Sequence, residues 1–295
     1  MSKGKYATPY SMRMALEERL NRIAKEKGHD VMRLRRQVAF DRLLARIFVR
    51  QTHDMVMKGG YSLELRLDHA RTTKDIDLSF RGNLGGAWKE NSTANQETLQ
   101  EFLQSCASID TGDFLEFVIG AATMDLQNAP YGGYRFPVDT RMAGRPFIRF
   151  SIDIAAGDTW IEPHEVITTH DWFDFAGISA PGVPVISPEQ QFAEKLHAYT
   201  LPRETANSRV KDLFDLYILS RKDILDSDRT KWATKLTFDR RKTHPFPPEF
   251  TDPPGNWAAP FAKLASTCGL EINISGAVAE VKEFCGTHDL AYIKF

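Results

Sequence analysis

The stretch that decides the fold is Arg71-Thr-Thr-Lys-Asp75-Ile-Asp77-Leu-Ser-Phe80. From Asp75 onward it alternates polar with apolar side chains, the pattern of a strand with one buried face. Asp75 and Asp77 then share a face, ~6–7 Å apart along the strand. Aspartate is uncommon in strands, and two like charges so close repel each other unless a cation offsets them. The stretch therefore predicts a strand that presents two carboxylates to a divalent cation.

A second strand with the same pattern is predicted at residues 145–156, RPFIRFSIDIAA. Its apolar face carries Phe150, Ile152 and Ile154, and its polar face carries Asp153. If this strand lies beside the first, three carboxylates share one sheet face and form an oxygen site of the kind that binds Mg²⁺ and assists displacement at phosphorus. Taken alone, Asp153 is also compatible with a solvated residue on an exposed sheet face.

A glycine pair precedes both strands, in Lys58-Gly59-Gly60-Tyr61-Ser62 at the end of an apolar strand. Glycines let the backbone approach a ligand closely, and the N-terminus of a following helix offers N–H groups to phosphate. The same pair also fits a plain tight turn.

The remaining elements are predicted from periodicity and capping signals. Helices are expected at 11–28 with Ser11 as N-cap, from Asp30 onward with Asp30 as its cap, near 95–107, at 188–199 and near 207–221. Ser187 is the predicted N-cap of the fourth helix, with Gln190 as its capping-box partner. A strand is expected at 113–126, followed by a loop that reaches the 145–156 strand. Residues 243–256 form a Pro-rich connector, and the last forty residues read as helical.

This order predicts an α+β fold: a small mixed or antiparallel sheet flanked by helices, with a helical C-terminal part. We expect three segments: a basic helical N-terminal segment (1–50), a core (51–185) and a helical C-terminal lobe (186–295).

Composition narrows the class of protein. The chain has 295 residues, net charge −1 and three cysteines without a CxxC pair, so neither a disulfide framework nor a thiolate zinc site is expected. The N-terminus lacks the apolar region of a secretory signal, and no apolar run approaches the roughly 20 residues of a membrane span. A cytoplasmic protein without membrane contact is therefore expected.

The near-zero net charge hides a local excess. Residues 1–50 contain 13 Lys and Arg against 5 Asp and Glu, a net +8, so the remainder carries −9. The arginines of this segment are a candidate surface for nucleic-acid phosphates, or else a solvated helix face. The arginines proposed for this surface are Arg33, Arg35, Arg36, Arg42, Arg46 and Arg50.

Four separated sequence blocks match the motifs of one protein family and follow each other in the same order as in that family. They are KGGYSLELRL (58–67), RTTKDIDLSF (71–80), FSIDIAAGD (150–158) and EKLHAYTLPRETANSRVKDLFDLYIL (194–219). The chain thereby resembles the AbiEii/AbiGii toxins, including the MenT-type toxins, of the polymerase-β-like nucleotidyltransferase superfamily. The resemblance spans roughly residues 50–225 and implies the minimal nucleotidyltransferase sheet.

The resemblance also implies roles for residues. Asp75, Asp77 and Asp153 would be the metal-binding and catalytic acids, with Lys195 and Asp212 as further catalytic residues. Nucleotide-binding residues would be Lys58, Gly59, Gly60, Ser62, Arg203 and Arg209. Thr73 would be the hydroxyl that an antitoxin phosphorylates to silence the site. Judged without the resemblance, Lys195 could also be an ordinary surface lysine. Asp212 could likewise lie on a solvated helix face and take part in a surface salt bridge.

The implied function is transfer of a nucleoside monophosphate from an NTP to an RNA, with the 3′ end of tRNA as the leading acceptor. The ion would be Mg²⁺, with Mn²⁺ as the alternative. The partners would be the NTP, the RNA and a cognate antitoxin, and the result a block of translation. Two alternatives stay open: AMPylation of a protein by the same fold, and a catalytically weak module that binds nucleotide or RNA.

Overall fold

A computed structural model describes residues 6–49, 54–81, 93–126, 130–202, 209–221, 223–245, 251–288 and 290. The chain divides into two compact units. The first comprises Met1–Met57, Thr72–Gly157 and Val166–Val185, and the second comprises Lys58–Arg71, Asp158–Glu165 and Ile186–Phe295. The three-segment division expected from the sequence, at residues 50 and 185, stays a prediction.

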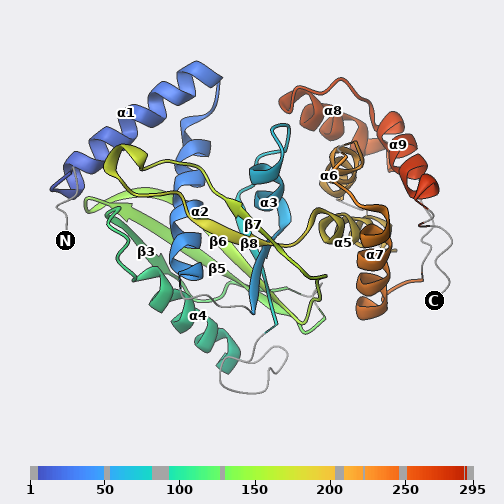
Figure 1. The fold of residues 1–295 in the computed structure, drawn as a ribbon, viewed down its shortest axis with the longest axis horizontal. Helices are drawn as coiled ribbons and strands as arrows, with labels where there is room; N and C mark the ends of the chain where they lie inside the picture. Colours follow the sequence, from blue (N-terminus) through green and yellow to red (C-terminus); the bar gives the residue numbers. More distant parts are fainter. Residues whose placement is uncertain are drawn as a thin grey trace. The chain divides into compact units, whose positions relative to one another are not determined.

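The first unit is built on a mixed sheet (Figure 1). In the described part of the chain the strand order is β3-β5-β6-β2-β1-β8-β7, and β4 also pairs with β5. The strands are β1 (Met55–Lys58), β2 (Asp75–Phe80), β3 (Leu115–Ile119), β4 (Met124–Asp125), β5 (Gly133–Met142), β6 (Arg145–Ala156), β7 (Glu165–Thr168) and β8 (Gly182–Val185). The pairs β2–β6 and β1–β8 are parallel, whereas β5 runs antiparallel to β3, β4 and β6.

Strand β5 corrects the sequence analysis, which placed a loop between the strands at 113–126 and 145–156. Those residues contain a ten-residue strand, and the predicted 113–126 strand is split into β3 and β4. Pro137 favoured the prediction of a loop, because proline is unusual inside a sheet. The usable signal is the alternation of Tyr134, Phe136 and Val138, which are all buried.

The described α-helices of the first unit are α1 (Pro9–Lys27), α2 (Val31–Phe48) and α4 (Thr93–Ala107). Thr8, not the predicted Ser11, is the N-cap of α1, because its Oγ1 accepts the Ser11 N–H and proline follows it. Gly28 ends α1 with φ 64°, a conformation that glycine adopts without strain. Asp30 caps α2 as predicted.

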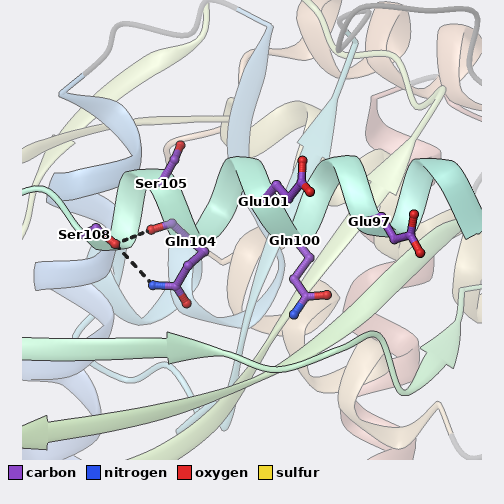
Figure 2. Close-up of a pocket in the computed structure, with 6 residues that line it drawn as sticks. All are labelled: Glu97, Gln100, Glu101, Gln104, Ser105 and Ser108. Carbon is purple, nitrogen blue, oxygen red and sulfur yellow. Dashed lines mark hydrogen bonds between the residues drawn. The ribbon is translucent and has the colours of Figure 1, made fainter.

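The edge strand β3 is covered by side chains of α4 rather than by another strand. Gln104 donates to the Phe117 carbonyl and accepts the Ile119 N–H, while Gln100 donates to the Ile119 carbonyl. Both glutamines line a depression along α4 whose other lining residues are Glu97, Glu101, Ser105 and Ser108 (Figure 2).

A buried ion cluster joins α2 to Asp113, which lies two residues before β3. The Asp113 carboxylate accepts from Arg42 Nε at 2.7 Å and from Arg46 Nη2 at 2.6 Å, and its pKa is lowered to about 2 because these two cations outweigh the effect of burial. Arg42 and Arg46 are 5% and 2% exposed, so the prediction that they offer an RNA-binding surface is wrong. Arg35 pairs with Glu17, and Arg50 lies outside the described residues.

The second unit is helical, which confirms the predicted C-terminal helical part. It contains α3 (Gly59–Arg66), α5 (Pro188–Thr200), α6 (Val210–Ser220), α7 (Ser227–Arg241), α8 (Ala258–Thr267) and α9 (Ile274–Thr287). Its apolar core includes Leu63, Phe192, Phe214, Phe261 and Val281. Ser187 caps α5 as predicted, but the Gln190 side chain does not close a capping box; it instead bonds Thr237 and the Ile161 N–H.

The observed elements confirm the α+β prediction. Among the described residues, no helix is both long and apolar enough to cross a membrane. Cys106, Cys268 and Cys285 are buried and free of disulfides.

His197 on α5 is a buried titratable group of the second unit. It is 3% exposed, lies 2.8 Å from Thr243 Oγ1 and packs against Phe238 and His244. Burial lowers its pKa to about 3, and the nearby charge of Arg241 acts in the same direction.

Replacing Asp113 with Asn should cost about 3–5 kcal/mol of stability, because two buried guanidinium groups lose their counter-charge. Urea unfolding measures the loss. Asp139→Asn is the matched control: its ion pair with Arg149 has side chains 46% and 84% exposed, and the change should cost no more than about 1 kcal/mol. Equal losses in both variants would contradict the role of the cluster.

Lowering the pH should reduce the free energy of unfolding, because the buried His197 is harder to protonate in the folded protein than in the unfolded chain. Since the folded pKa is depressed, the unfolded chain binds the extra proton, and the stability is complete above about pH 6.5 and declines as the pH falls toward 3. Compared with the wild type, His197→Gln should show a slope shallower by about 1.4 kcal/mol per pH unit in that window. Urea unfolding at pH 4.5, 5.5 and 6.5 tests this; parallel slopes would refute it.

Candidate active site

The carboxylates of β2 and β6 form one group of candidate site residues, which lies within the first unit. In β2, Asp75 and Asp77 are half-buried while Ile76 and Leu78 are fully buried, so the two acids share the face opposite the apolar side chains. Strand β6 pairs with β2 in parallel, and its register sets Asp153 directly beside Asp77. The predicted pairing of the two acid-bearing strands is therefore confirmed. Asp153 is 7% exposed, which excludes the solvated alternative.

Arg135 on β5 is a site residue that the sequence analysis missed, because it lies in the segment expected to be a loop. Its Nε donates to Asp153 Oδ1 at 2.7 Å and its Nη2 to Asp153 Oδ2 at 2.6 Å. The same Nη2 lies 3.3 Å from Asp75 Oδ2. Hydrogen bonding to Asp153, together with the charges of Asp153, Asp75 and Asp77, raises the pKa of Arg135 above its ordinary value.

The donor chemistry at β2 fits a magnesium ion. In the parts of the chain that the structure describes, no three Asp, Glu, His or Cys side chains are grouped closely enough to form a complete metal cage. Mg²⁺ does not need such a cage, since it is usually held by one or two carboxylates together with waters and substrate phosphates. Asp75, with 35% of its side chain exposed, and Asp77 beside it supply such a pair.

Thr73 lies two residues before the start of β2 and contacts the first acid, Asp75. Its hydroxyl donates to Asp75 Oδ1 at 3.1 Å, and the residue is 4% exposed. A charged group placed on this oxygen would therefore lie directly against the Asp75 carboxylate.

The glycine pair opens helix α3 in the second unit. Strand β1 ends at Lys58 and α3 begins at Gly59, whose φ of 73° is the left-handed conformation that favours glycine. Ser62 is fully buried and donates to the Gly59 carbonyl at 2.9 Å. Gln191 on α5 donates to the same carbonyl and to Ser62 Oγ, so it fixes the first turn of α3. Gln191 was not among the residues predicted for the site.

Lys58 is held inside the second unit by acids. Its Nζ lies 2.5 Å from Asp158 Oδ2 and 3.7 Å from Glu194 Oε2, and Arg241 binds the same two acids. Burial by itself lowers the pKa of Lys58, but the charges of Asp158 and Glu194 outweigh it and the pKa is raised. The pKa of Asp158 is lowered to about 2, because Lys58 and Arg241 overcome the opposing effect of its burial. Asp158 belongs to the quoted FSIDIAAGD block, yet it was not predicted as a site residue.

Lys195 on α5 forms a second buried group with two acids of α6. Its Nζ lies 2.8 Å from Asp212 Oδ1 and 3.0 Å from Asp215 Oδ2. Burial alone would lower the pKa of Lys195, but Asp212 and Asp215 raise it, and Lys195 in turn holds the pKa of Asp212 below its usual range. Asp212 and Asp215 are 5% and 0% exposed, so the alternative of a solvated helix face is wrong.

Two arginines complete this group. Arg71 forms a two-contact ion pair with Asp215, with its Nε at 3.0 Å and its Nη2 at 2.9 Å from the two oxygens. Arg209, the N-cap residue of α6, lies 3.2 Å from Asp212 Oδ2. Arg203 lies outside the described residues. The structure thus brings Asp75, Asp77 and Asp153 together in the first unit, and Lys195, Asp212 and Arg209 together in the second.

Comparison with solved structures finds similar chains, among them the following three. MenT4, a nucleotidyltransferase toxin from Mycobacterium tuberculosis, aligns over 92% of this chain and 98% of its own, with 18% identity and a TM-score of 0.54. JHP933 from Helicobacter pylori covers 84% of this chain and 88% of its own, at 16% identity and a TM-score of 0.44. A putative nucleotidyltransferase from H. pylori covers 88% and 96%, at 16% identity and 0.46. The likeness to MenT4 shows a shared fold.

Sequence comparison identifies the family. Curated protein sequences include no match to this chain. The profile described as "Nucleotidyl transferase AbiEii toxin, Type IV TA system" matches residues 42–267, which include both groups of candidate site residues. Because the match spans well over half of the 295 residues, the chain belongs to the AbiEii family of nucleotidyltransferase toxins of type IV toxin–antitoxin systems.

Proposed function

We propose that this nucleotidyltransferase moves a nucleoside monophosphate from an NTP to an RNA, with the 3′ end of tRNA as acceptor and Mg²⁺ or Mn²⁺ as the required ion. The observation that carries the proposal is the pair of carboxylates on β2. Asp75 and Asp77 share one sheet face, and the parallel neighbour β6 adds Asp153 in register with Asp77. Paired carboxylates at this spacing suit a cation that also binds phosphate oxygens.

Each side chain then has a task that its surroundings support. Held by Asp75 and Asp77, Mg²⁺ would offset negative charge on the triphosphate as pyrophosphate leaves. The backbone at Gly59 and Gly60 opens α3 and offers N–H groups to phosphate. Lys195 supplies a positive charge for the nucleotide, and Asp212 orients it through the 2.8 Å contact.

Lys58 and Ser62 support the glycine segment from within, since both are bound by other residues of the second unit. Arg209 and Arg203 stay proposed phosphate contacts. Arg209 is partly exposed beside Asp212, which leaves part of its guanidinium accessible to an anion.

As a type IV toxin the chain has a cognate antitoxin. We place its action in the cytoplasm, where NTP and tRNA occur, and infer that nucleotide added to tRNA blocks translation. With Arg42 and Arg46 buried, the RNA-binding role proposed for the N-terminal helices rests on Arg33, Arg36 and Arg50.

Nucleotide transfer is tested with radiolabelled NTPs, total tRNA and, separately, total protein, with and without Mg²⁺. Labelled tRNA is expected from the wild type, and Asp77→Ala should lose about 100-fold or more of the label because the ion loses a ligand. The matched control is Asp139→Ala on β5, an exposed acid of the same sheet, which should label tRNA as the wild type does.

The other outcomes separate the alternatives. Label on protein but not on RNA would replace the proposal with AMPylation. An absence of Mg²⁺-dependent label, with nucleotide still bound, would replace it with a binding module.

Silencing by the antitoxin is predicted to act through Thr73. A phosphate there would add roughly −1.5 to −2 charges against Asp75, which the hydroxyl already contacts at 3.1 Å. Mass spectrometry of the protein co-expressed with its antitoxin should find phosphothreonine at this position, and Thr73→Val should escape silencing. Full silencing with unmodified Thr73 would reject the prediction.

A further inference from the structure

Three neighbouring strands place Arg135, Asp153 and Asp77 in one row. Arg135 on β5 is the register partner of Asp153 on β6, and Asp153 is the register partner of Asp77 on β2. Adjacent strands lie ~4.8 Å apart, so an arginine side chain can reach across the middle strand toward the third. Arg135 does so, since its Nη2 contacts both Asp153 and Asp75.

Both carboxylate oxygens of Asp153 are occupied by this arginine. The contacts at 2.7 and 2.6 Å form a two-point, charge-assisted pair, the strongest geometry between an arginine and a carboxylate. The Asp153 side chain is 10% exposed, so water contributes little to its solvation. A metal ion at Asp153 would have to share these oxygens with the guanidinium or displace it.

The charges of the group support the same conclusion. The three carboxylates of Asp75, Asp77 and Asp153 have a total formal charge of −3, and the guanidinium of Arg135 contributes +1. The group therefore has a net charge of −2, which bound cations can neutralise. A single divalent ion offsets that charge. In a two-metal centre a shared carboxylate reaches both ions, and a second ion at Asp153 would have to use oxygens that each already accept from Arg135.

We infer that Arg135 is a positioning residue that keeps Asp153 out of the metal's ligand set, so that this chain binds one divalent ion through Asp75 and Asp77 and uses the guanidinium as a built-in second cation. The inference rests on the proposed metal-dependent function and deepens it. In this inference Asp153 holds the Arg135 side chain in place, and Arg135 offsets part of the negative charge of the three carboxylates.

The experiment titrates NTP-free protein with Mn²⁺ and counts bound ions by electron paramagnetic resonance and water-proton relaxation, so that the readout is independent of activity. The wild type should bind one Mn²⁺ at this site, and Asp75→Asn should abolish that binding. The double variant Arg135→Gln/Asp153→Asn, which replaces the ion pair with neutral side chains, should keep one ion with an affinity within about threefold of the wild type.

The single variant Arg135→Gln frees the Asp153 carboxylate and should bind Mn²⁺ at least about tenfold more tightly, or bind a second ion. The matched control lies on the same two strands, because Asp139 and Arg149 form another cross-strand ion pair, four residues further along. Asp139→Asn/Arg149→Gln should bind Mn²⁺ as the wild type does. If Arg135→Gln fails to fold, as thermal melting would reveal, the double variant still decides the question.

Two bound ions in the wild type, or a tenfold or greater loss of affinity in the Arg135→Gln/Asp153→Asn double variant, would overturn the inference and leave the metal-dependent function standing. Mn²⁺ binding that does not depend on Asp75 would overturn the proposed metal site itself, and the inference with it.

Discussion

The register between β5, β6 and β2 is the constraint on which the candidate site depends. Side chains alternate faces along a strand, so a shift of one residue would turn the carboxylates into the apolar core and carry Ile76 and Leu78 out of it. The cross-strand pair of Arg135 and Asp153 joins two of these strands on the acid-bearing face. Burial on one face and ion pairing on the other therefore favour the same alignment.

The second unit relies on buried ion pairs of a different kind. Lys58 and Lys195 each lie between two carboxylates, and in both cases the acids more than offset the cost of burying the ammonium group. A lysine fixed in this way keeps its positive charge and loses little further conformational freedom when an anion binds. The arrangement suits a residue that has to be charged and correctly oriented before the nucleotide arrives.

Local patterns in the sequence were sufficient to predict the strand of Asp75 and Asp77, the caps at Asp30 and Ser187, and the helical C-terminal part. They failed where tertiary partners decide the outcome. Because proline is unusual inside a strand, Pro137 led to the prediction of a loop where β5 lies, and Arg135 was placed in that loop. No local pattern indicated that Arg42 and Arg46 form buried ion pairs with Asp113. Asp215 was not predicted as part of the group around Lys195, because its partners Lys195 and Arg71 lie 20 and 144 residues away in the chain.

The glutamines of α4 have a consequence for solubility. An uncovered edge strand is a template on which another chain can add a strand and begin aggregation. On β3 that position is occupied by the side-chain amides of Gln100 and Gln104, which make three hydrogen bonds to the strand's backbone. An intruding strand would have to break these bonds before forming its own. Because the amides are uncharged, this protection holds at any salt concentration and across the pH range in which the fold is stable.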